Sequence, residues 1–251
     1  VYPLSQHIGA PAKAVVAVGD AVKRGQMLAE AGGFVSASIY SSVSGTVKEI
    51  LPRRVATGDM VMSIVIENDN EYSEVDFEEL SLDQVNGLTG EQILGKIKNA
   101  GIVGMGGAGF PTHVKLSPKN PEKIEYIIAN CAECEPYLTS DYRAILENTD
   151  KLVEGIKLIL KLFPNAKGVF GVENNKLDCI EKIRSLITDD NRLSVCELLT
   201  KYPQGGERQL IHAVTGRDIN SKMLPADTGC IVDNVATISA VYDAVYLGRP
   251  V

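Results

Sequence analysis

The stretch Ile124-Glu125-Tyr126-Ile127-Ile128-Ala129-Asn130 predicts a buried β-strand, because apolar and β-branched residues dominate it and no glycine or proline interrupts it. An amphipathic helix is expected next, at 150–162, with an apolar stripe from Leu152 to Leu160 and Pro164 closing it. A second strand is expected at 168–172. Strands that alternate with helices predict an α/β layer with a largely parallel sheet.

The same alternation continues on both sides of this stretch. A helix is expected at 91–98, where Ile93, Leu94 and Ile97 recur at helical spacing. We therefore assign residues 91–251 to one α/β domain. Its further elements are expected to be helices at 177–187, 206–214 and 235–246 and a strand at 193–199.

The amino-terminal residues 1–66 have a different pattern. Short β-branched stretches such as 42–47 and 61–66 are separated by glycine turns, which predicts a small β-barrel or sandwich. Residues 67–83 then carry eight acids and no Lys or Arg. We interpret 67–90 as an acidic linker that self-repulsion keeps extended, with an acidic docking site as the alternative.

Composition bounds the class of protein. The formal net charge of −7 disfavours a nucleic-acid surface, and no apolar run approaches the roughly 18 residues of a membrane helix. Five scattered cysteines fit a reducing compartment better than a disulfide framework. The start at Val1, without a methionine, and the stop at Val251 lead us to expect a trimmed fragment of a longer protein.

A glycine-rich loop, Gly104-Met105-Gly106-Gly107-Ala108-Gly109-Phe110-Pro111, precedes the first strand of the α/β domain. Its bare backbone can turn several N–H groups toward an anion, and Lys115 can add charge to the same anion. Because the loop follows a predicted helix and Pro111 stops it, it fits neither the dinucleotide-binding fingerprint nor the Walker loop. The alternative is a tight connection that only packs a helix against a strand.

The segment Asn130-Cys131-Ala132-Glu133-Cys134-Glu135-Pro136 follows the first strand, at the strand end where open α/β sheets bind ligands. Asn130 can donate and accept hydrogen bonds, as a heteroaromatic edge requires, and Glu133 and Glu135 can accept from ring N–H groups or ribose hydroxyls. Cys131 and Cys134 have the spacing of a metal or redox pair, but no further cysteine or histidine completes a site. We expect no metal there and interpret both as small packed side chains.

Two more segments join a strand or turn to a helix. Tyr202-Pro203-Gln204-Gly205-Gly206-Glu207 brings glycines to a helix start, as ligand approach to the backbone requires, although a plain turn is the alternative. In Cys230-Ile231-Val232-Asp233-Asn234-Val235-Ala236-Thr237, Asp233 or Asn234 can simply cap the final helix. The three histidines are dispersed and form no catalytic set, so we name no catalytic residue.

Taken together, the four segments resemble the flavin-binding domain of the respiratory complex I flavoprotein subunit. That family has a Gly-x-Gly-Gly-Ala-Gly-Phe-Pro loop with a downstream lysine, then Asn-Ala-Asp-Glu-Gly-Glu-Pro, Tyr-x-x-Gly-Glu-Glu and Asn-Asn-Val-Glu-Thr segments. All four occur here in the same order. This chain departs from the pattern at Ala132, Gly206, Asp233 and Ala236, three of which replace a carboxylate of the family.

The resemblance implies a Rossmann-like α/β domain that binds flavin mononucleotide (FMN), and it implies a role for each matching residue. Glycines of the first segment and its lysine would hold the phosphate and ribityl chain; the later carboxylates would line the side for nicotinamide dinucleotide (NAD). The implied cofactor-binding residues are Gly104, Gly106, Gly107, Phe110, Lys115, Asn130, Glu133, Glu135, Gly205, Glu207, Asp233, Asn234 and Thr237.

The amino-terminal segment looks like a barrel-sandwich hybrid of the biotinyl/lipoyl type. The hairpin at 32–37 has no lysine, so it carries no prosthetic group. This barrel followed by this flavin domain is the arrangement of the RnfC family, which belongs to the Rnf electron-transport complex, and the similarity covers nearly the whole chain.

That resemblance implies an NADH-dependent flavin oxidoreductase subunit that passes electrons to 4Fe-4S clusters in a missing carboxy-terminal part. Its partners would be the other subunits of an ion-translocating complex, on the cytoplasmic side of the bacterial plasma membrane. Two alternatives stay open. One is a cobalamin reductase with the same two domains, and the other is a docking scaffold that has lost its cofactor.

Overall fold

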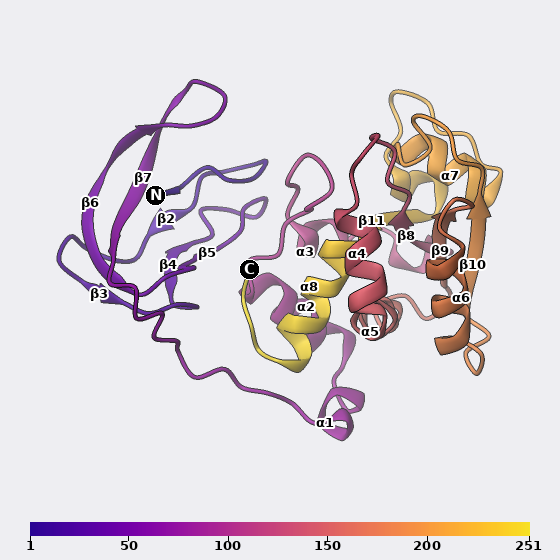
Figure 1. Ribbon diagram of the computed structural model, residues 1–251, viewed down its shortest axis with the longest axis horizontal. Helices are drawn as coiled ribbons and strands as arrows, with labels where there is room; N and C mark the ends of the chain where they lie inside the picture. Colours follow the sequence, from indigo (N-terminus) through magenta and orange to yellow (C-terminus); the bar gives the residue numbers. More distant parts are fainter. The chain divides into compact units, whose positions relative to one another are not determined.

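A computed structural model describes residues 1–251. The chain divides into two compact units. The first comprises Val1–Leu88, Leu94–Val114 and Asp243–Val251, and the second comprises Thr89–Ile93 and Lys115–Tyr242. The ribbon of each unit can be followed by its colours in Figure 1.

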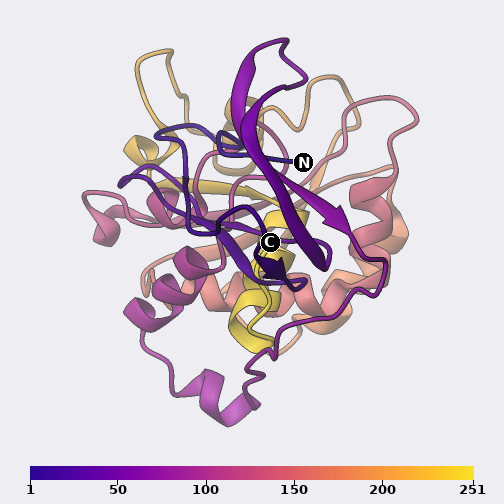
Figure 2. The same cartoon turned by 90° about the vertical axis from the view of Figure 1, so that its left-hand side faces the viewer.

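The first unit contains a small β-barrel made of two antiparallel sheets, as predicted. Leu28, Val47 and Ile64 fill the space between the sheets with no exposed surface. The long β6–β7 hairpin, purple in Figures 1 and 2, turns at Val55–Asp59, where the Val55 and Gly58 N–H groups donate across the turn. One sheet has the order β1 (Tyr2–Pro3), β7 (Met60–Asn68), β6 (Gly45–Arg54), β3 (Ala21–Val22), and the other β2 (Lys13–Ala14), β4 (Met27–Glu30), β5 (Ile39–Tyr40).

The acidic segment after β7 lies along the barrel and then forms a helix. The Val75 N–H donates to the Arg24 carbonyl, and the Arg24 guanidinium lies 3.0 Å from the Glu74 carboxylate. Helix α1 (Leu82–Asn86) follows, and Ser81 and Gln84 close its first turn as a capping box. The segment interpreted as an extended connector therefore contains a helix that the composition did not indicate.

The second unit is a parallel four-stranded sheet with helices on both faces. Gly168 of β9 leaves room for Ile156 and Leu160 of α5, while Ile128 of β8 packs with Leu210 of α7 on the opposite face. This confirms the predicted α/β layer. The sheet order is β10 (Leu193–Leu198), β9 (Lys167–Glu173), β8 (Tyr126–Cys131), β11 (Cys230–Asn234). The helices are α4 (Ser140–Glu147), α5 (Thr149–Leu160), α6 (Leu177–Leu186) and α7 (Glu207–Thr215), with 3-10 turns at Pro121–Lys123 and Pro225–Thr228.

Three helices have residues in both units or at their boundary: α2 (Gly90–Asn99), α3 (Thr112–Lys115) and α8 (Val235–Tyr246). Within the second unit, α8 crosses α5 closely at Gly155. A Cβ atom at Gly155 would lie 2.3 Å from the Ile238 carbonyl oxygen. A glycine is therefore required there for the helix behind β11 to pack against α5.

The chain order of the strands reverses between β8 and β11. The first three strands of the sheet run outward from β8 through β9 to β10, and the chain then returns to place β11 on the other side of β8. Asn130 and Asn234, at the ends of these two strands, are register partners. The reversal opens a crevice at the carboxyl ends of the strands, which is where open α/β sheets bind ligands.

Candidate functional site

Asn130 holds two of the predicted segments together at the end of β8. Its Nδ2 donates to the Gly205 carbonyl at 2.9 Å, and its Oδ1 accepts from the Ala132 N–H at 3.2 Å. The Gly205 N–H in turn donates to Cys134 Sγ. A Cβ at Gly205 would lie 2.5 Å from the Ala132 carbonyl oxygen, so only glycine fits at this crossing. The second and third segments are thus packed against each other.

Asn234 closes the end of β11 and starts α8. Its Oδ1 accepts from the Ala236 N–H at 2.8 Å, which confirms the predicted helix cap. Its Nδ2 donates to Asp141 Oδ2 at 2.7 Å. Thr237 lies buried in the first turn of the same helix. A helix N-terminus with free N–H groups favours an anion, so this end of α8 is suited to a phosphate.

Asp141 is a site residue that the sequence did not single out. Burial raises its pKa, nearby Glu133 raises it further, and the hydrogen bond from Asn234 opposes both effects. An aspartate in the first turn of a helix is ordinary, so no local pattern distinguishes it. Its importance comes from contact with Asn234, which lies far along the chain.

Glu133 is turned toward the start of α4. Its Oε1 accepts from the Asp141 N–H at 3.0 Å and lies 3.2 Å from the Ser140 hydroxyl, which donates to it. The Tyr142 N–H donates to Oε2 at 3.4 Å. Glu133 therefore supplies acceptors for the free N–H groups of this helix end. Glu135, two residues on, is exposed.

Lys115 is surrounded by acceptors of the second unit. Its Nζ donates to the Val232 carbonyl and lies 3.4 Å from Glu207 Oε1 and 3.4 Å from Asp233 Oδ1. Burial disfavours the charged ammonium, but the two carboxylates outweigh it, so the pKa of Lys115 is raised. The predicted phosphate ligand thus already holds two carboxylates.

Asp233 carries an unsatisfied oxygen. The residue is 3% exposed, and its Oδ2 has no hydrogen-bond partner. Burial raises the pKa of Asp233 despite the attraction of Lys115. A buried polar atom without a partner is costly, and such atoms mark places where a further group completes the site. Asp233 is therefore an available acceptor at the switch point.

The glycine loop belongs to the first unit, whereas the predicted site residues from Lys115 onward belong to the second. An antiparallel bridge between Val103 and Pro111 closes its base, and the Gly104 N–H donates to the Phe110 carbonyl at 2.9 Å. Gly106 and Gly107 are exposed, and no atom lies within 4 Å of a Cβ placed at Gly107. The chain's own packing therefore does not require glycine at Gly107.

The loop differs in one respect from the expectation. The sequence predicts that Pro111 stops it, but α3 begins at Thr112, directly after the proline. Proline has no N–H to lose at a helix start, so it precedes this helix without penalty. His113 of α3 is buried, and burial lowers its pKa. A neutral imidazole at that position packs the helix base rather than serving a proton transfer.

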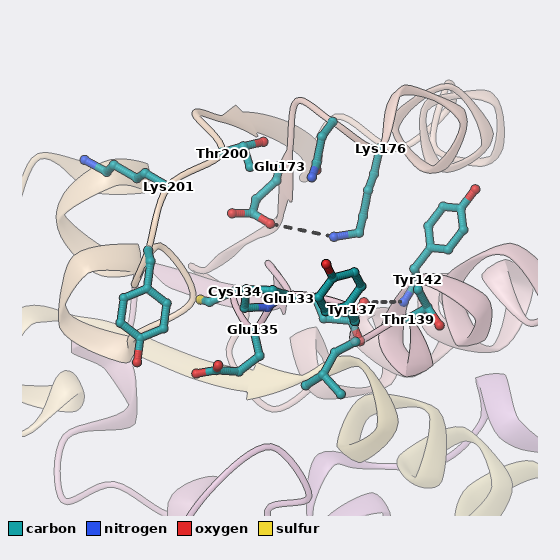
Figure 3. A pocket seen from close by; sticks show the side chains of 14 residues that line it. Glu133, Cys134, Glu135, Tyr137, Thr139, Tyr142, Glu173, Lys176, Thr200 and Lys201 are labelled. Atoms are coloured by element: carbon teal, nitrogen blue, oxygen red, sulfur yellow. Dashed lines mark hydrogen bonds and ion pairs between the residues drawn. The ribbon is translucent and has the colours of Figure 1, made fainter.

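Beside the crevice, a hollow of about 450 Å³ lies over the ends of β8, β9 and β10 (Figure 3). Glu173 and Lys176 form an ion pair of 3.7 Å in its wall, with side chains only 2% and 11% exposed. The sequence did not single out these two residues, because neither belongs to a glycine-rich or strand-end motif. The other polar and aromatic lining residues include Glu133, Glu135, Tyr137, Tyr142, Thr200 and Tyr202.

Comparison with known protein families matches both parts of the chain. Residues 1–71 match the RnfC barrel sandwich hybrid domain. Residues 97–243 match the Nuo51 FMN-binding domain. The second match contains all of the predicted site residues, from Gly104 to Thr237.

Curated relatives match over the full length of this chain, and each is the RnfC-type component of its complex. The relative from the Na+-translocating ferredoxin:NAD+ oxidoreductase complex of Acetobacterium woodii is 44% identical over 250 residues, 100% of this chain and 56% of that protein. The proton-translocating counterpart of Clostridium ljungdahlii is 46% identical, over 99% of this chain and 54% of that protein. The relative from the ion-translocating oxidoreductase complex of Pseudomonas aeruginosa is 39% identical, with 32% of that protein covered. The chain thus spans about half the length of the first two relatives, or less.

Solved structures share the fold. Two crystal structures of NAD+-reducing [NiFe]-hydrogenase, H2-reduced and air-oxidised, align over 70% of this chain and 37% and 36% of theirs. Their TM-scores are 0.52 and 0.53 at 22% and 24% sequence identity.

None of the helices has both the length and the apolar character needed to cross a membrane. The two family matches, in this order along the chain, agree with the relatives that match it over its whole length. This chain therefore belongs to the RnfC family of ion-translocating ferredoxin:NAD+ oxidoreductase complexes, and consists of the barrel-sandwich hybrid and the FMN-binding domain of that family.

Proposed function

We propose that this chain is the FMN-binding electron-input module of a membrane-associated, ion-translocating complex. It accepts hydride from NADH and passes electrons to 4Fe-4S clusters elsewhere in the full protein. The observation that carries the proposal is the polar crevice between β8 and β11, where Asn130, Asn234 and the N-terminus of α8 meet. This crevice lies in the part of the chain that matches an FMN-binding domain.

The residues of the crevice suit FMN by their chemistry. A phosphate suits the N-terminus of α8 and the hydroxyl of Thr237, and exposed Gly107 leaves backbone free for a second approach. A flavin ring and ribityl chain supply N–H and O–H donors, which the unpartnered Oδ2 of Asp233 lacks. The proposal assigns phosphate and ribityl to Gly104, Gly106, Gly107, Asn234 and Thr237, and the ring to Asn130 and Asp233, with Phe110 stacking.

Bound FMN supplies the two-electron acceptance and one-electron release that protein side chains cannot provide. The chain's own residues bind and orient. Asn130 and Asn234 are each held by hydrogen bonds to backbone and side-chain atoms, so their geometry is set before a ligand arrives. Lys115 keeps its proton on Nζ and places a fixed positive charge beside Asp233.

The dinucleotide side is assigned to Glu133, Glu135, Gly205 and Glu207. Gly206 replaces a family glutamate, and a Cβ there would lie 2.7 Å from Gln209 Oε1. This position has little room for the longer side chain. The partners proposed for the whole protein are NADH and the other subunits of the complex, at the cytoplasmic face of the membrane.

The test is FMN reconstitution followed by anaerobic addition of NADH. We expect the purified chain to take up FMN, to show a flavin absorption spectrum and to lose it when NADH is added. A Gly107→Val variant is expected to keep its stability, because open space surrounds that Cβ, yet to bind FMN about tenfold or more weakly.

Gly95→Val in α2 serves as the matched control, since its Cβ also meets nothing within 4 Å. A chain that folds but takes up no FMN would support the scaffold alternative. Equal FMN affinity of Gly107→Val and the wild type would remove the loop from the site.

A further inference from the structure

The hollow at the ends of β8, β9 and β10 is separate from the crevice at β11. Loops after three successive strands line it, and the segment after β8 is the one that it shares with the crevice. A volume of about 450 Å³ is in the range of small-molecule sites. Its deepest residues, Glu173 and Lys176, have no role in the proposed binding of FMN.

Tyr137 stands over this hollow in an unfavourable state. Its φ of +67° lies in the left-handed region, which a tyrosine side chain disfavours. Its relative exposure is 102%, so the ring makes no apolar contact that offsets this cost. Strained, exposed aromatic residues cluster at ligand sites, because the ligand supplies the missing contact.

Lys176 faces Tyr137 from the opposite wall (Figure 3). Its side chain is 11% exposed, and Glu173 behind it is 2% exposed, so both charges are largely removed from water. The pair is long, at 3.7 Å, which leaves donor capacity on the ammonium. An ammonium held in this way by a buried carboxylate is a preset binding point for an anion that enters the hollow.

Carboxylate and hydroxyl groups complete the lining. Glu135 is an exposed acceptor that suits the diol of a ribose, and Thr200 and Asn175 offer small polar groups. A stacking ring, a buried cation and a diol acceptor match a purine base, a phosphate and a ribose. Tyr202, 70% exposed, offers a second aromatic face at the rim.

We propose that this hollow binds the adenosine diphosphate half of NADH. The adenine stacks on Tyr137, a phosphate lies beside Lys176, and Glu135 accepts from the ribose hydroxyls. The proposal rests on the proposed use of NADH and assigns the adenosine half to the β9 side of the β8 segment. The nicotinamide half then extends along the shared segment toward the crevice.

The experiment is calorimetric titration with ADP-ribose, which carries the adenosine diphosphate group and has no nicotinamide to reduce a flavin. We expect the wild type to bind it and Tyr137→Ala to bind it about tenfold more weakly, as for a lost base–aromatic stack. Tyr137→Phe keeps the ring and is expected to bind within about twofold of the wild type. Tyr137 is fully exposed, so neither variant threatens the fold.

Tyr72→Ala is the matched control, because Tyr72 is also an exposed tyrosine with positive φ (51°) and lies in the first unit. Unchanged ADP-ribose affinity in Tyr137→Ala, or an equal loss in Tyr72→Ala, would overturn the proposal. Displacement of ADP-ribose by FMN alone would also overturn it, since the hollow would then be a flavin site. FMN uptake without NADH bleaching would instead contradict the proposed function.

Discussion

Lys115 and Asp233 share a poorly solvated corner of the second unit. Burial works against both charges, but Lys115 also has Glu207 and the Val232 carbonyl, whereas Asp233 has only Lys115. The pKa of Lys115 is therefore raised and its charge is kept, while the pKa of Asp233 is raised because burial prevails. The carboxyl of Asp233 is the weak member of this pair.

The raised pKa of Asp233 predicts a pH dependence of stability. In the unfolded chain this carboxyl loses its proton near its ordinary pKa of about 3.9, but the folded chain keeps the proton to higher pH. The folded state then binds more protons, so the free energy of unfolding falls as pH rises through this window. Asp233→Asn removes the titration, and we expect its urea unfolding midpoint to fall less between pH 4 and pH 7.

Asp141 also has a raised pKa, but it is present in both proteins, so the difference between the two curves reports Asp233. Parallel curves for wild type and variant from pH 4 to pH 7 would contradict this account.

At the scale of elements, the two asparagines work because the helices behind them are placed closely. Helix α8 starts at Asn234 and is held against α5 where Gly155 faces the Ile238 carbonyl. A helix shifted by even part of an ångström would move the N–H groups that Asn234 leaves free. The start of α8 is therefore set by a glycine that belongs to a different helix.

Substitution of two helical glycines should separate packing from propensity. Gly155→Ala places a methyl 2.3 Å from a backbone oxygen, and we expect a loss of about 1–3 kcal/mol of unfolding free energy. Gly95→Ala in α2 meets nothing within 4 Å, and we expect a gain of about 0.5–1 kcal/mol. Chemical denaturation of both variants tests this; changes of the same sign would show that the α5–α8 contact is not tight.

At the scale of the whole molecule, a ligand bound only by the folded state stabilises it. If the crevice holds FMN through the N-terminus of α8, the phosphate is part of that stabilisation. Two compact units also provide an internal reference, because the assigned crevice residues from Asn130 to Thr237 lie in the second unit.

FMN at about 100 times its dissociation constant should add about 2.7 kcal/mol to the unfolding free energy. Riboflavin, which has the same ring and no phosphate, should add clearly less at the same concentration. Thermal unfolding with each compound measures the difference. Equal shifts would mean that the phosphate is not bound by the protein.

Much of the fold could be predicted because its signals are local. Periodicity predicts α8 at 235–246, its observed range, and α2 at 91–98 against an observed Gly90–Asn99. Apolar periodicity depends only on neighbours in the chain, so it survives without tertiary information. Strand β11 and helix α4 were missed. The first is five residues long, and Glu133 caps the second from seven residues before its start.

The sequence by itself determined the α/β layer, the amino-terminal barrel and the family, because these follow from periodicity and from motifs in order along the chain. Only the tertiary structure decided which residues meet. Asp141 reaches Asn234 across 93 positions, and Lys115 reaches the Val232 carbonyl across 117. Such contacts depend on strand order, since β11 returns beside β8 only after the sheet has been built outward to β10. No local pattern carries that information.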